Sequence, residues 1–264
     1  MSLFKKKRGT DETIKNGANL ITVADPKGPV TEQFRTIRTN INFMAVDHDI
    51  KSVAFTSANI SEGKSTVAAN VAVTYAQAGR KVLLIDADLR RPTVHRTFNL
   101  SNHVGLSTVI SSTAKEVDLD DVVQDSGIAD LAILPAGPTP PNPSELIGSK
   151  RMQDFISLVE DHYDMVIIDL APVLEVSDTQ ELARRLDGII LVVRQGKTQK
   201  AAIKRAVEML NFSKAKVLGF IMNDISSDNA GYGYGYGYGY GYGYGYGYGE
   251  EDKKKKGFFS GRKK

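Results

Sequence analysis

Six short runs of apolar, mostly β-branched residues recur along this chain, and segments with helical spacing separate them. Runs of this kind are typical of strands buried on both faces of a parallel sheet, whose crossover connections are helices. The pattern predicts an α/β fold of three layers, with a mostly parallel sheet between helices. The predicted strands span residues 52–58, 81–86, 130–134, 164–169, 188–194 and 217–223.

Three segments have the composition and spacing of helices. Residues 64–78 are rich in Ala and Val and end before Gly79, a residue that favours helix termination, and residues 200–210 repeat the pattern. Ahead of the first strand, residues 31–46 predict an amphipathic helix with Thr31 as its N-cap. This helix would be an N-terminal extension of the core.

The composition divides the 264-residue chain into one core and its extensions. A hydrophobic content of 41% supports one buried core, and the length is too short for two ordinary domains. After Asp228 the sequence becomes a strict alternation of Gly and Tyr, which we expect to be disordered because ordering glycine costs entropy. We predict a basic extension at 1–30, an α/β domain at 31–228, a tyrosine cluster at 229–249 and a basic tail at 250–264.

The net charge of +3 comes from the two ends of the chain. Residues 5–8 and residues 250–264 are both basic, so the remainder is net acidic. This layout predicts no nucleic-acid partner, and leaves open whether the ends contact an anionic membrane surface or are only solvated. The chain has no cysteine, which excludes disulfides and thiolate metal sites, and it has no apolar run of the roughly 20 residues that span a bilayer.

A phosphate-binding loop follows the first predicted strand. Residues 58–66 fit the P-loop pattern, with Ala58 in the place of the first glycine. The backbone N–H groups of such a loop bind phosphates, while Lys64 reaches the β and γ phosphates and the Ser65 hydroxyl is a ligand for Mg²⁺. We therefore expect ATP and Mg²⁺, with the nucleotide held by Ser61, Glu62, Gly63, Lys64, Ser65 and Thr66.

Carboxylates end two other predicted strands. Asp86 and Asp88 follow the strand at 81–86, and Asp169 ends the strand at 164–169. Ligands of parallel sheets bind at the carboxyl edge of the strands, and Mg²⁺ prefers oxygen ligands. The three carboxylates are therefore expected to meet at a metal–nucleotide site; the alternative is that they only end strands or cap helices.

Together these motifs resemble the bacterial tyrosine kinases that control capsule and exopolysaccharide synthesis. The resemblance covers residues 20–250, and the loop at 58–66, the Asp86-x-Asp88-x-Arg90 segment and Asp169 are similar to the Walker A, A′ and B motifs of that family. It implies a protein-tyrosine kinase that uses ATP. The catalytic residues implied by the resemblance are Lys64, Asp86, Asp88 and Asp169.

The resemblance also implies a role for each polar residue of the site. Asp86 would be the general base that accepts the proton of the tyrosine hydroxyl, and Ser65, Asp88 and Asp169 would hold Mg²⁺. Asn223, at the end of the last predicted strand, lies where related P-loop ATPases recognise adenine, although an asparagine that only ends a strand is equally consistent.

Two segments depart from the family pattern. Ile60-Ser61 replaces the usual Pro-Gly of the loop, and Leu170-Ala171 replaces the usual Thr-Pro after Asp169. The first change leaves the geometry of the loop open. Asp169 and Pro172 remain, so metal binding is expected to be kept, while the loss of a nearby polar contact could reduce activity.

The Gly-Tyr segment would be the phosphoacceptor in such a kinase. A flexible glycine-rich chain of about 18 residues has a root-mean-square span of roughly 20–25 Å, which is sufficient to enter the site of an adjacent subunit. The alternative is a low-complexity linker without a catalytic role. The candidate phosphoacceptors are Tyr232, Tyr234, Tyr236, Tyr238, Tyr240, Tyr242, Tyr244, Tyr246 and Tyr248.

Partners also follow from the resemblance. Glu32, Arg35 and Arg38 match the family's Glu-x-x-Arg-x-x-Arg contact between subunits and imply a ring homo-oligomer. The family further implies a membrane-anchored modulator of the polysaccharide co-polymerase type and a tyrosine phosphatase that reverses the reaction. The expected location is the cytoplasm, at the inner face of the cell membrane through the modulator.

Two other functions fit parts of the sequence. A MinD/ParA-like positioning ATPase shares the expected fold, but those proteins carry a signature lysine at the position of Asn59 and have no tyrosine tail. A weakly catalytic scaffold gated by nucleotide, in which the polysaccharide machinery senses assembly or tail charge, is the second alternative.

Overall fold

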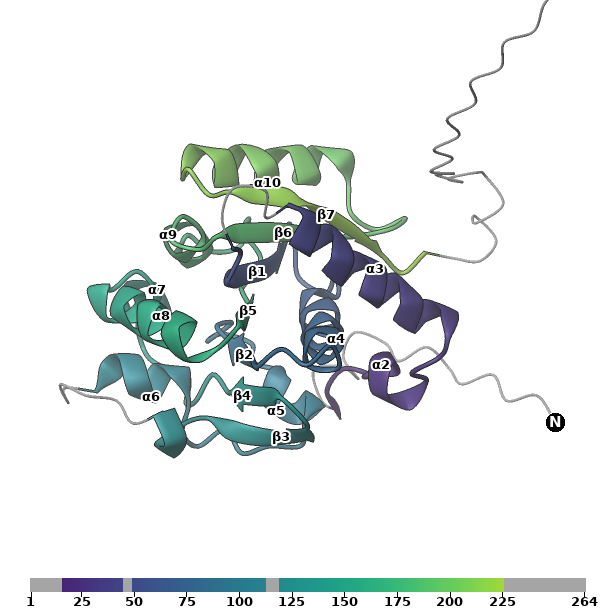
Figure 1. Cartoon of the computed structure of the whole chain (residues 1–264). Coiled ribbons are helices and arrows are strands. Elements are labelled where there is room, and N and C mark those ends of the chain that lie inside the picture. Colours follow the sequence, from purple (N-terminus) through teal and green to yellow (C-terminus); the bar gives the residue numbers. More distant parts are fainter. Residues whose placement is uncertain (1–15, 45–48, 113–118, 226–264) are drawn as a thin grey trace, which may run out of the picture. The chain divides into compact units, whose positions relative to one another are not determined.

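The structure is a computed structural model that describes residues 16–44, 49–112 and 119–225 (Figure 1). The predicted tyrosine cluster at 229–249 and basic tail at 250–264 lie outside these residues, as does the first half of the basic extension. None of the helices in the described ranges has the length and apolar character that crossing a bilayer requires.

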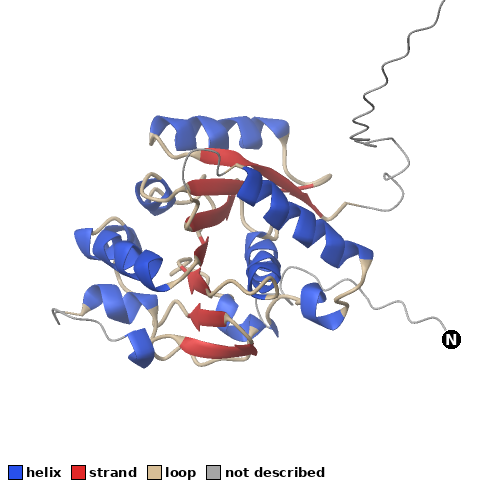
Figure 2. Cartoon of the chain, in the orientation of Figure 1, coloured by secondary structure: helices blue, strands red, loops and turns tan. Residues whose placement is uncertain are grey.

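A sheet of seven strands forms the centre of the domain (Figure 2). Its strand order is β3-β4-β2-β5-β1-β6-β7, and every neighbouring pair is parallel except β3 and β4, which are antiparallel. The strands are β1 (Ser52–Ser57), β2 (Val82–Asp86), β3 (Gln124–Ile128), β4 (Leu131–Leu134), β5 (Met165–Asp169), β6 (Gly188–Arg194) and β7 (Val217–Asn223). The predicted mostly parallel sheet is confirmed.

All six predicted strands are present, and none of their ends differs by more than one residue from the prediction. The prediction missed β3. This strand lies at the edge of the sheet, and its sequence Gln-Asp-Ser-Gly-Ile contains no residue that is fully buried. Because β3 contributes little to the core, it lacks the β-branched run by which the other strands were found.

Helices cover the sheet and connect its strands. They are α2 (Ile21–Ala24), α3 (Pro29–Phe43), α4 (Lys64–Ala76), α5 (Val94–Thr97), α6 (Leu106–Ser111), α7 (Pro143–Ile147), α8 (Lys150–His162), α9 (Asp178–Ala183) and α10 (Lys200–Phe212), with a short 3₁₀ turn at Leu119–Asp121. The predicted helices correspond to α3, α4 and α10. The short helices α2, α5, α6, α7 and α9, and the amphipathic α8, were not predicted.

The prediction of Thr31 as the N-cap of α3 was wrong. The helix begins at Pro29 after the N-cap Gly28, because the fixed φ of proline suits the first helical position. Thr31 is buried, and its Oγ1 donates a hydrogen bond to the Asp25 carbonyl oxygen at 2.7 Å. Thr31 therefore fastens the segment before α3 to the helix.

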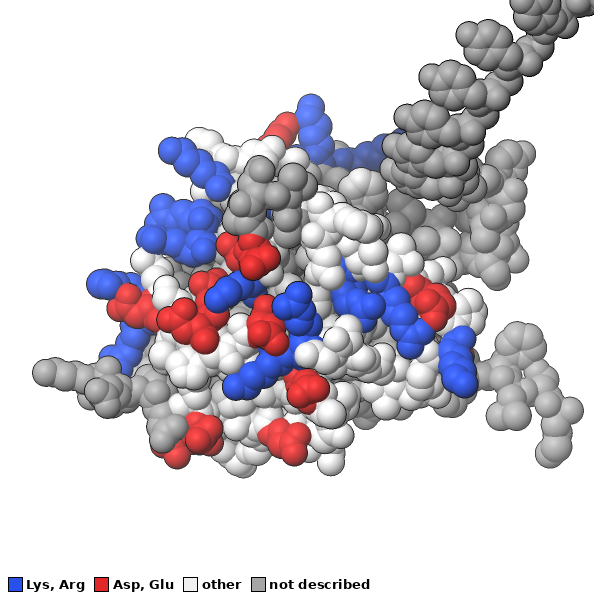
Figure 3. All heavy atoms as spheres, in the orientation of Figure 1, with Lys and Arg blue, Asp and Glu red and all other residues white. Residues whose placement is uncertain are grey.

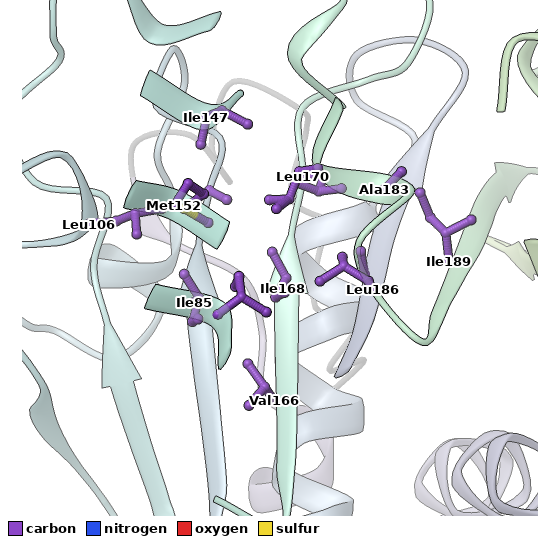
Figure 4. Close-up of a cluster of buried hydrophobic side chains, with 14 of the residues drawn as sticks. Ile85, Leu106, Ile147, Met152, Val166, Ile168, Leu170, Ala183, Leu186 and Ile189 are labelled. Atoms are coloured by element: carbon purple, nitrogen blue, oxygen red, sulfur yellow. The ribbon is translucent and has the colours of Figure 1, made fainter. Parts of the chain in front are cut away.

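Two hydrophobic clusters lie on the two faces of the sheet, which confirms the three layers. Alternate residues of a strand point to opposite faces, so Leu83 and Ile85 join the cluster under α6 to α10, while Val82 and Leu84 join the cluster under α3 to α5. Figure 4 shows part of the first cluster, where Ile168 of β5 lies among side chains from β2 and the covering helices. The buried sheet holds the carboxyl ends of its central strands in fixed register.

Asn70 of α4 joins the N-terminal segment to the core. Its side chain is fully buried, and its Oδ1 accepts hydrogen bonds from the Thr22 N–H at 3.1 Å and the Thr22 Oγ1 at 2.9 Å. Its Nδ2 donates to the carbonyl oxygens of Asn19 at 3.0 Å and Thr66 at 2.9 Å. One amide thus satisfies four polar groups of three residues.

We expect Asn70→Ala to lower the free energy of unfolding by about 2–4 kcal/mol, because the buried polar groups of Thr22 and the Asn19 carbonyl oxygen would lose their partner. Urea denaturation of the variant measures this loss. Asn211→Ala, at an exposed position of α10, is the matched control and is expected to change stability by less than about 0.5 kcal/mol. Equal effects of the two substitutions would show that the Asn70 bonds do not stabilise the fold.

Candidate active site

The predicted P-loop and carboxylates lie at the carboxyl ends of three adjacent strands, β2, β5 and β1, and the predicted Asn223 ends β7. Asp86 and Asp169 are register partners at the ends of β2 and β5, and Phe55 of β1 pairs with Asp169 on the other side. The loop at 58–63 leaves β1 at the same edge and leads into α4. The sheet therefore brings the predicted loop and the predicted carboxylates to one place.

The loop has two residues in the left-handed backbone region. Ser61 has φ 65° and Gly63, the N-cap of α4, has φ 93°. A Cβ atom on Gly63 would lie 2.0 Å from the Asn223 Nδ2, so Gly63 is required for its conformation and for its close approach to β7. Ala58, in the place of the usual first glycine, is fully buried at the end of β1.

The Glu62 side chain points back into the loop and is buried. Its Oε2 accepts a hydrogen bond from the Ala58 N–H at 3.0 Å, and its Oε1 accepts from the Asn59 Nδ2 at 3.1 Å and the Thr198 Oγ1 at 2.8 Å. The Asn223 Nδ2 donates to the Glu62 carbonyl oxygen at 3.0 Å. The carboxylate of Glu62 is therefore engaged in bracing the loop, and its backbone N–H is the part that could contact a phosphate.

Lys64 lies between two carboxylates. Its Nζ is 2.9 Å from the Asp88 Oδ2, 3.2 Å from the Asp169 Oδ1 and 3.3 Å from the Ser65 Oγ. Burial alone would lower the pKa of Lys64, but Asp169 and Asp88 outweigh it and raise this pKa above its usual value. Lys64 also holds the pKa of Asp88 below its usual range, although burial acts in the opposite direction. A charged lysine thus neutralises part of a buried acidic site.

Asp86 accepts three backbone hydrogen bonds. Its Oδ1 accepts from the Asp88 N–H at 3.2 Å, and its Oδ2 accepts from the Thr93 N–H at 2.9 Å and the Val94 N–H at 3.0 Å. Burial, and then the negative charge of Asp169, raise the pKa of Asp86 to about 8. Asp86 therefore shapes the segment between β2 and α5, and its raised pKa suits a group that accepts a proton.

The oxygen atoms around Lys64 fit a hydrated Mg²⁺. The Asp169 Oδ2 is buried and has no hydrogen-bond partner among the described residues, and burial raises the pKa of Asp169. The Lys64 Nζ, which contacts Asp169, also contacts the Ser65 hydroxyl and the Asp88 carboxylate, so that all three oxygen groups surround one lysine. Within the described ranges no group of three or more acidic or His side chains is placed as a ready-made metal site.

Comparisons with known proteins agree with this geometry. The AAA domain family matches residues 50–216, and the chain belongs to it. Tyrosine-protein kinase YwqD of Bacillus subtilis is 50% identical over 205 residues, which make up 78% of this chain and 85% of that protein. The chain belongs to the bacterial tyrosine-protein kinases. It is thus a protein-tyrosine kinase with a P-loop.

Solved structures give the same result. The kinase domain of the Escherichia coli tyrosine kinase ETK matches with a TM-score of 0.75 and 29% identity, over 94% of this chain and 89% of that domain. The chimerical protein CapA2B2 matches with a TM-score of 0.72 and 37% identity, over 80% of this chain and 96% of that one. The fold resemblance stated from the motifs is confirmed.

Three residues that support the kinase loop were missed by the sequence analysis. Arg194 is the last residue of β6, and Thr198 and Asp224 lie just beyond the ends of β6 and β7. The Arg194 Nη1 donates to the Ser61 carbonyl oxygen at 3.1 Å. No local motif marks these residues. Arg194 and Thr198 lie more than 130 positions from their loop partners, and Asp224 acts on the loop only through Arg194. Their one available signal is their place at the carboxyl edge of predicted strands.

The predicted subunit-contact residues of the kinase lie on α3. Arg35 makes an ion pair with Glu32 within the same helix and donates from its Nη2 to the Pro26 carbonyl oxygen at 2.9 Å. The Arg38 Nη1 donates to the Thr74 carbonyl oxygen of α4 at 2.5 Å. Arg38 therefore has a structural role inside the chain, whereas the exposed side chain of Glu32 is available to a second subunit.

Basic and acidic side chains are interspersed on the face of the kinase domain drawn in Figure 3. A nucleic-acid-binding surface usually carries a stripe or patch of one sign. The face shown has no such stripe among its described residues, and the absence of a nucleic-acid partner stays a prediction.

Proposed function

We propose that this kinase phosphorylates its own C-terminal tyrosines, in trans within a ring oligomer, and that it thereby regulates capsular or exopolysaccharide synthesis or export. The observation that carries the proposal is the position of Lys64 between Asp88 and Asp169 beside the P-loop. This is the arrangement of a site for a nucleotide and a divalent cation, and the nine tyrosines between Tyr232 and Tyr248 are the acceptors that the same chain supplies.

Phosphoryl transfer depends on positioning and on charge stabilisation. The tyrosine oxygen forms a bond to the γ phosphorus while the bond from that phosphorus to the β–γ bridging oxygen breaks, ADP leaves, and the phenol proton passes to Asp86. Lys64 and the N–H groups of the loop stabilise charge on the phosphates. Mg²⁺, held by Ser65, Asp88 and Asp169, would supply further charge neutralisation. Asn223 would orient the adenine from the end of β7.

The environment of the Asp86 carboxyl supports its proposed role as the general base. A tyrosine hydroxyl has a reference pKa near 10, so a carboxylate of ordinary acidity is a weak acceptor for its proton. Because burial and Asp169 raise the pKa of Asp86, its basicity is closer to that of the phenolate. The backbone hydrogen bonds to Asp86 hold it in one orientation at the edge of β2.

The proposed partners are a membrane-anchored modulator of the polysaccharide co-polymerase type, a tyrosine phosphatase and further copies of this chain. One similar solved structure is a chimerical protein, CapA2B2, which fits a kinase that works with a second component. The proposed location is the cytoplasm, at the inner face of the cell membrane through the modulator. The basic residues at both ends would add contact with anionic lipid.

The test is to mix the protein with Mg-ATP and the cytoplasmic segment of its modulator, and to map phosphate by mass spectrometry. We expect phosphotyrosine between Tyr232 and Tyr248 in the wild type and its loss in Lys64→Met, because Lys64 contacts the transferred phosphate. A mixture of Lys64→Met with a chain whose nine tail tyrosines are phenylalanine should restore phosphate on the Lys64→Met tail if transfer occurs in trans.

Two results would contradict the proposal. ATP hydrolysis with an unmodified tail would favour a positioning ATPase, and nucleotide-dependent assembly without turnover would favour a scaffold. A tail modified in the wild type but unmodified in the mixture would leave the autokinase in place and place the transfer in cis.

The proposed ring makes a separate prediction for α3. We expect Glu32→Ala combined with Arg35→Ala to reduce the solution mass to that of one chain, because both side chains are exposed in part on the helix surface. Light scattering measures this change, and Thr39→Ala on the same helix is the control. Arg38→Ala is expected to lower stability by about 1–2 kcal/mol as well, since it removes the bond to the Thr74 carbonyl oxygen. An oligomer unchanged by the double substitution would place the subunit contact elsewhere.

A further inference from the structure

The P-loop is braced from the side by the ends of β6 and β7. The Arg194 Nη1 donates to the Ser61 carbonyl oxygen at 3.1 Å, and the Thr198 Oγ1 donates to the Glu62 Oε1 at 2.8 Å. The Arg194 N–H in turn donates to the Thr198 Oγ1 at 2.9 Å. Two consecutive residues of the loop are thus held by one short segment that lies far from them in the sequence.

Ser61 is the residue of the loop that most needs such support. It has φ 65°, a left-handed conformation that disfavours side chains with a Cβ atom. Glycine adopts this conformation without such a cost. Where right- and left-handed residues alternate, successive N–H groups turn to one side and form a concave anion site. The geometry of Ser61 therefore affects how well the loop receives phosphate.

Arg194 is itself fixed by an ion pair. Its Nε and Nη2 donate to the Asp224 Oδ2 at 3.0 Å and 2.9 Å. This paired arrangement orients the planar guanidinium group, so that Nη1 faces the Ser61 carbonyl oxygen. Both side chains of the pair are partly exposed, at 29% and 26%. An ion pair of this exposure contributes little to overall stability, so a role in stability alone would have a small effect.

We propose that Arg194, oriented by Asp224, is a positioning residue that holds Ser61 in the left-handed conformation with which the P-loop binds the phosphates of ATP. It acts through the backbone of Ser61 and makes no contact with the reacting atoms. The bond from Arg194 at the end of β6 thus offsets the conformational cost of a serine at position 61. The inference rests on the proposed binding of ATP in this loop, and it is independent of which tyrosine accepts the phosphate.

The test is a double-mutant cycle between the two residues, read out as the dissociation constant for Mg-ATP by calorimetry. We expect Arg194→Ala to weaken binding by about tenfold, because small displacements of a positioned group have large effects. Ser61→Gly alone is expected to bind at least as tightly as the wild type. In the Ser61→Gly background, Arg194→Ala should weaken binding by less than about threefold, since glycine adopts the conformation unaided.

Controls separate this role from folding and from charge. Arg205→Ala removes an exposed arginine of α10 and should leave the dissociation constant unchanged. Asp224→Asn keeps Arg194 but weakens its orientation, and asparagine tolerates the left-handed φ of 59° at that position, so this variant tests the brace even if Arg194→Ala does not fold. We expect it to weaken binding in the serine background and not in the Ser61→Gly background.

An equal loss of affinity from Arg194→Ala in both backgrounds would overturn the inference, because the arginine would then act independently of the Ser61 conformation. An unchanged affinity in the serine background would also overturn it. A wild-type protein that binds no Mg-ATP would instead refute the proposed function, so the two failures are distinguishable.

Discussion

Lys64→Met is expected to lower the free energy of unfolding by about 3–5 kcal/mol at neutral pH without nucleotide, in addition to lowering phosphoryl transfer by at least about 10²-fold. Lys64 is the cation that faces the buried carboxylates of Asp88 and Asp169. Without it, these carboxylates remain buried and uncompensated. Chemical denaturation in a buffer free of Mg²⁺ measures the loss.

The loss of stability should depend on pH in a defined direction. Lys64 holds the pKa of Asp88 low in the wild type, so the ion pair contributes stability above the unfolded pKa of about 4 and loses it below. In Lys64→Met the same carboxyls have raised pKa values and take up protons more readily when folded. The difference between variant and wild type is therefore greatest near pH 7 and decreases as the pH falls towards 4.

The matched control for this prediction is Lys204→Met. Lys204 lies on α10 with a side chain that is 79% exposed and 3.8 Å from Glu208, so its removal is expected to change stability by less than about 0.5 kcal/mol. If the two lysine variants were equally stable at pH 7, the buried carboxylates would not depend on Lys64 for compensation, and the electrostatic account of the site would be wrong.

The second large effect is expected at Gly63. Gly63→Ala should weaken Mg-ATP binding by about 100-fold or more, because the new Cβ atom would lie 2.0 Å from the Asn223 Nδ2 and the residue has φ 93°. Relief of the contact requires movement of the loop or of the end of β7. Calorimetric titration with Mg-ATP measures the change.

Gly79→Ala is the matched control for Gly63→Ala. Gly79 has φ 76° after the C-terminus of α4, yet a Cβ atom there would meet nothing within 4 Å. Its substitution therefore has the backbone cost alone, about 1–2 kcal/mol of stability, and should leave nucleotide affinity unchanged. Combining Gly63→Ala with Asn223→Ala should recover part of the affinity only if the contact with the amide contributes to the defect. Affinity that is unaffected by Gly63→Ala would contradict the observed loop geometry.

The parts of the fold that were predictable are those that sequence pattern determines locally. Strands buried on both faces require apolar runs, so β1, β2, β5 and β6 were evident from composition. The carboxyl-edge rule then placed Asp86, Asp88 and Asp169 near Lys64, and the structure brings these four side chains together. The edge strand β3 and the short helices, with few buried residues each, gave no such pattern.

The supports of the loop could not be predicted in the same way. The contacts of Glu62 with Thr198 and of Ser61 with Arg194 join residues more than 130 positions apart, and only the strand order brings β6 beside β1. Thr31 was assigned to a cap because threonine favours that position, whereas Pro29 begins the helix earlier. Local preference was overridden in this case by a residue two positions away.

The helix α4 has a consequence for how assembly and nucleotide binding could influence each other. Its first residue is Lys64, and farther along it Asn70 holds the N-terminal segment, Thr74 accepts the bond from Arg38, and Tyr75 bonds to Asn42 of α3 at 2.9 Å. From Lys64 to Thr74 the helix extends only about 15 Å, a length over which an α-helix is stiff. A partner that displaces α3 is therefore expected to displace α4 as well, and with it the phosphate-binding Lys64. Movement of Lys64 on nucleotide binding would likewise be transmitted through α4 to α3.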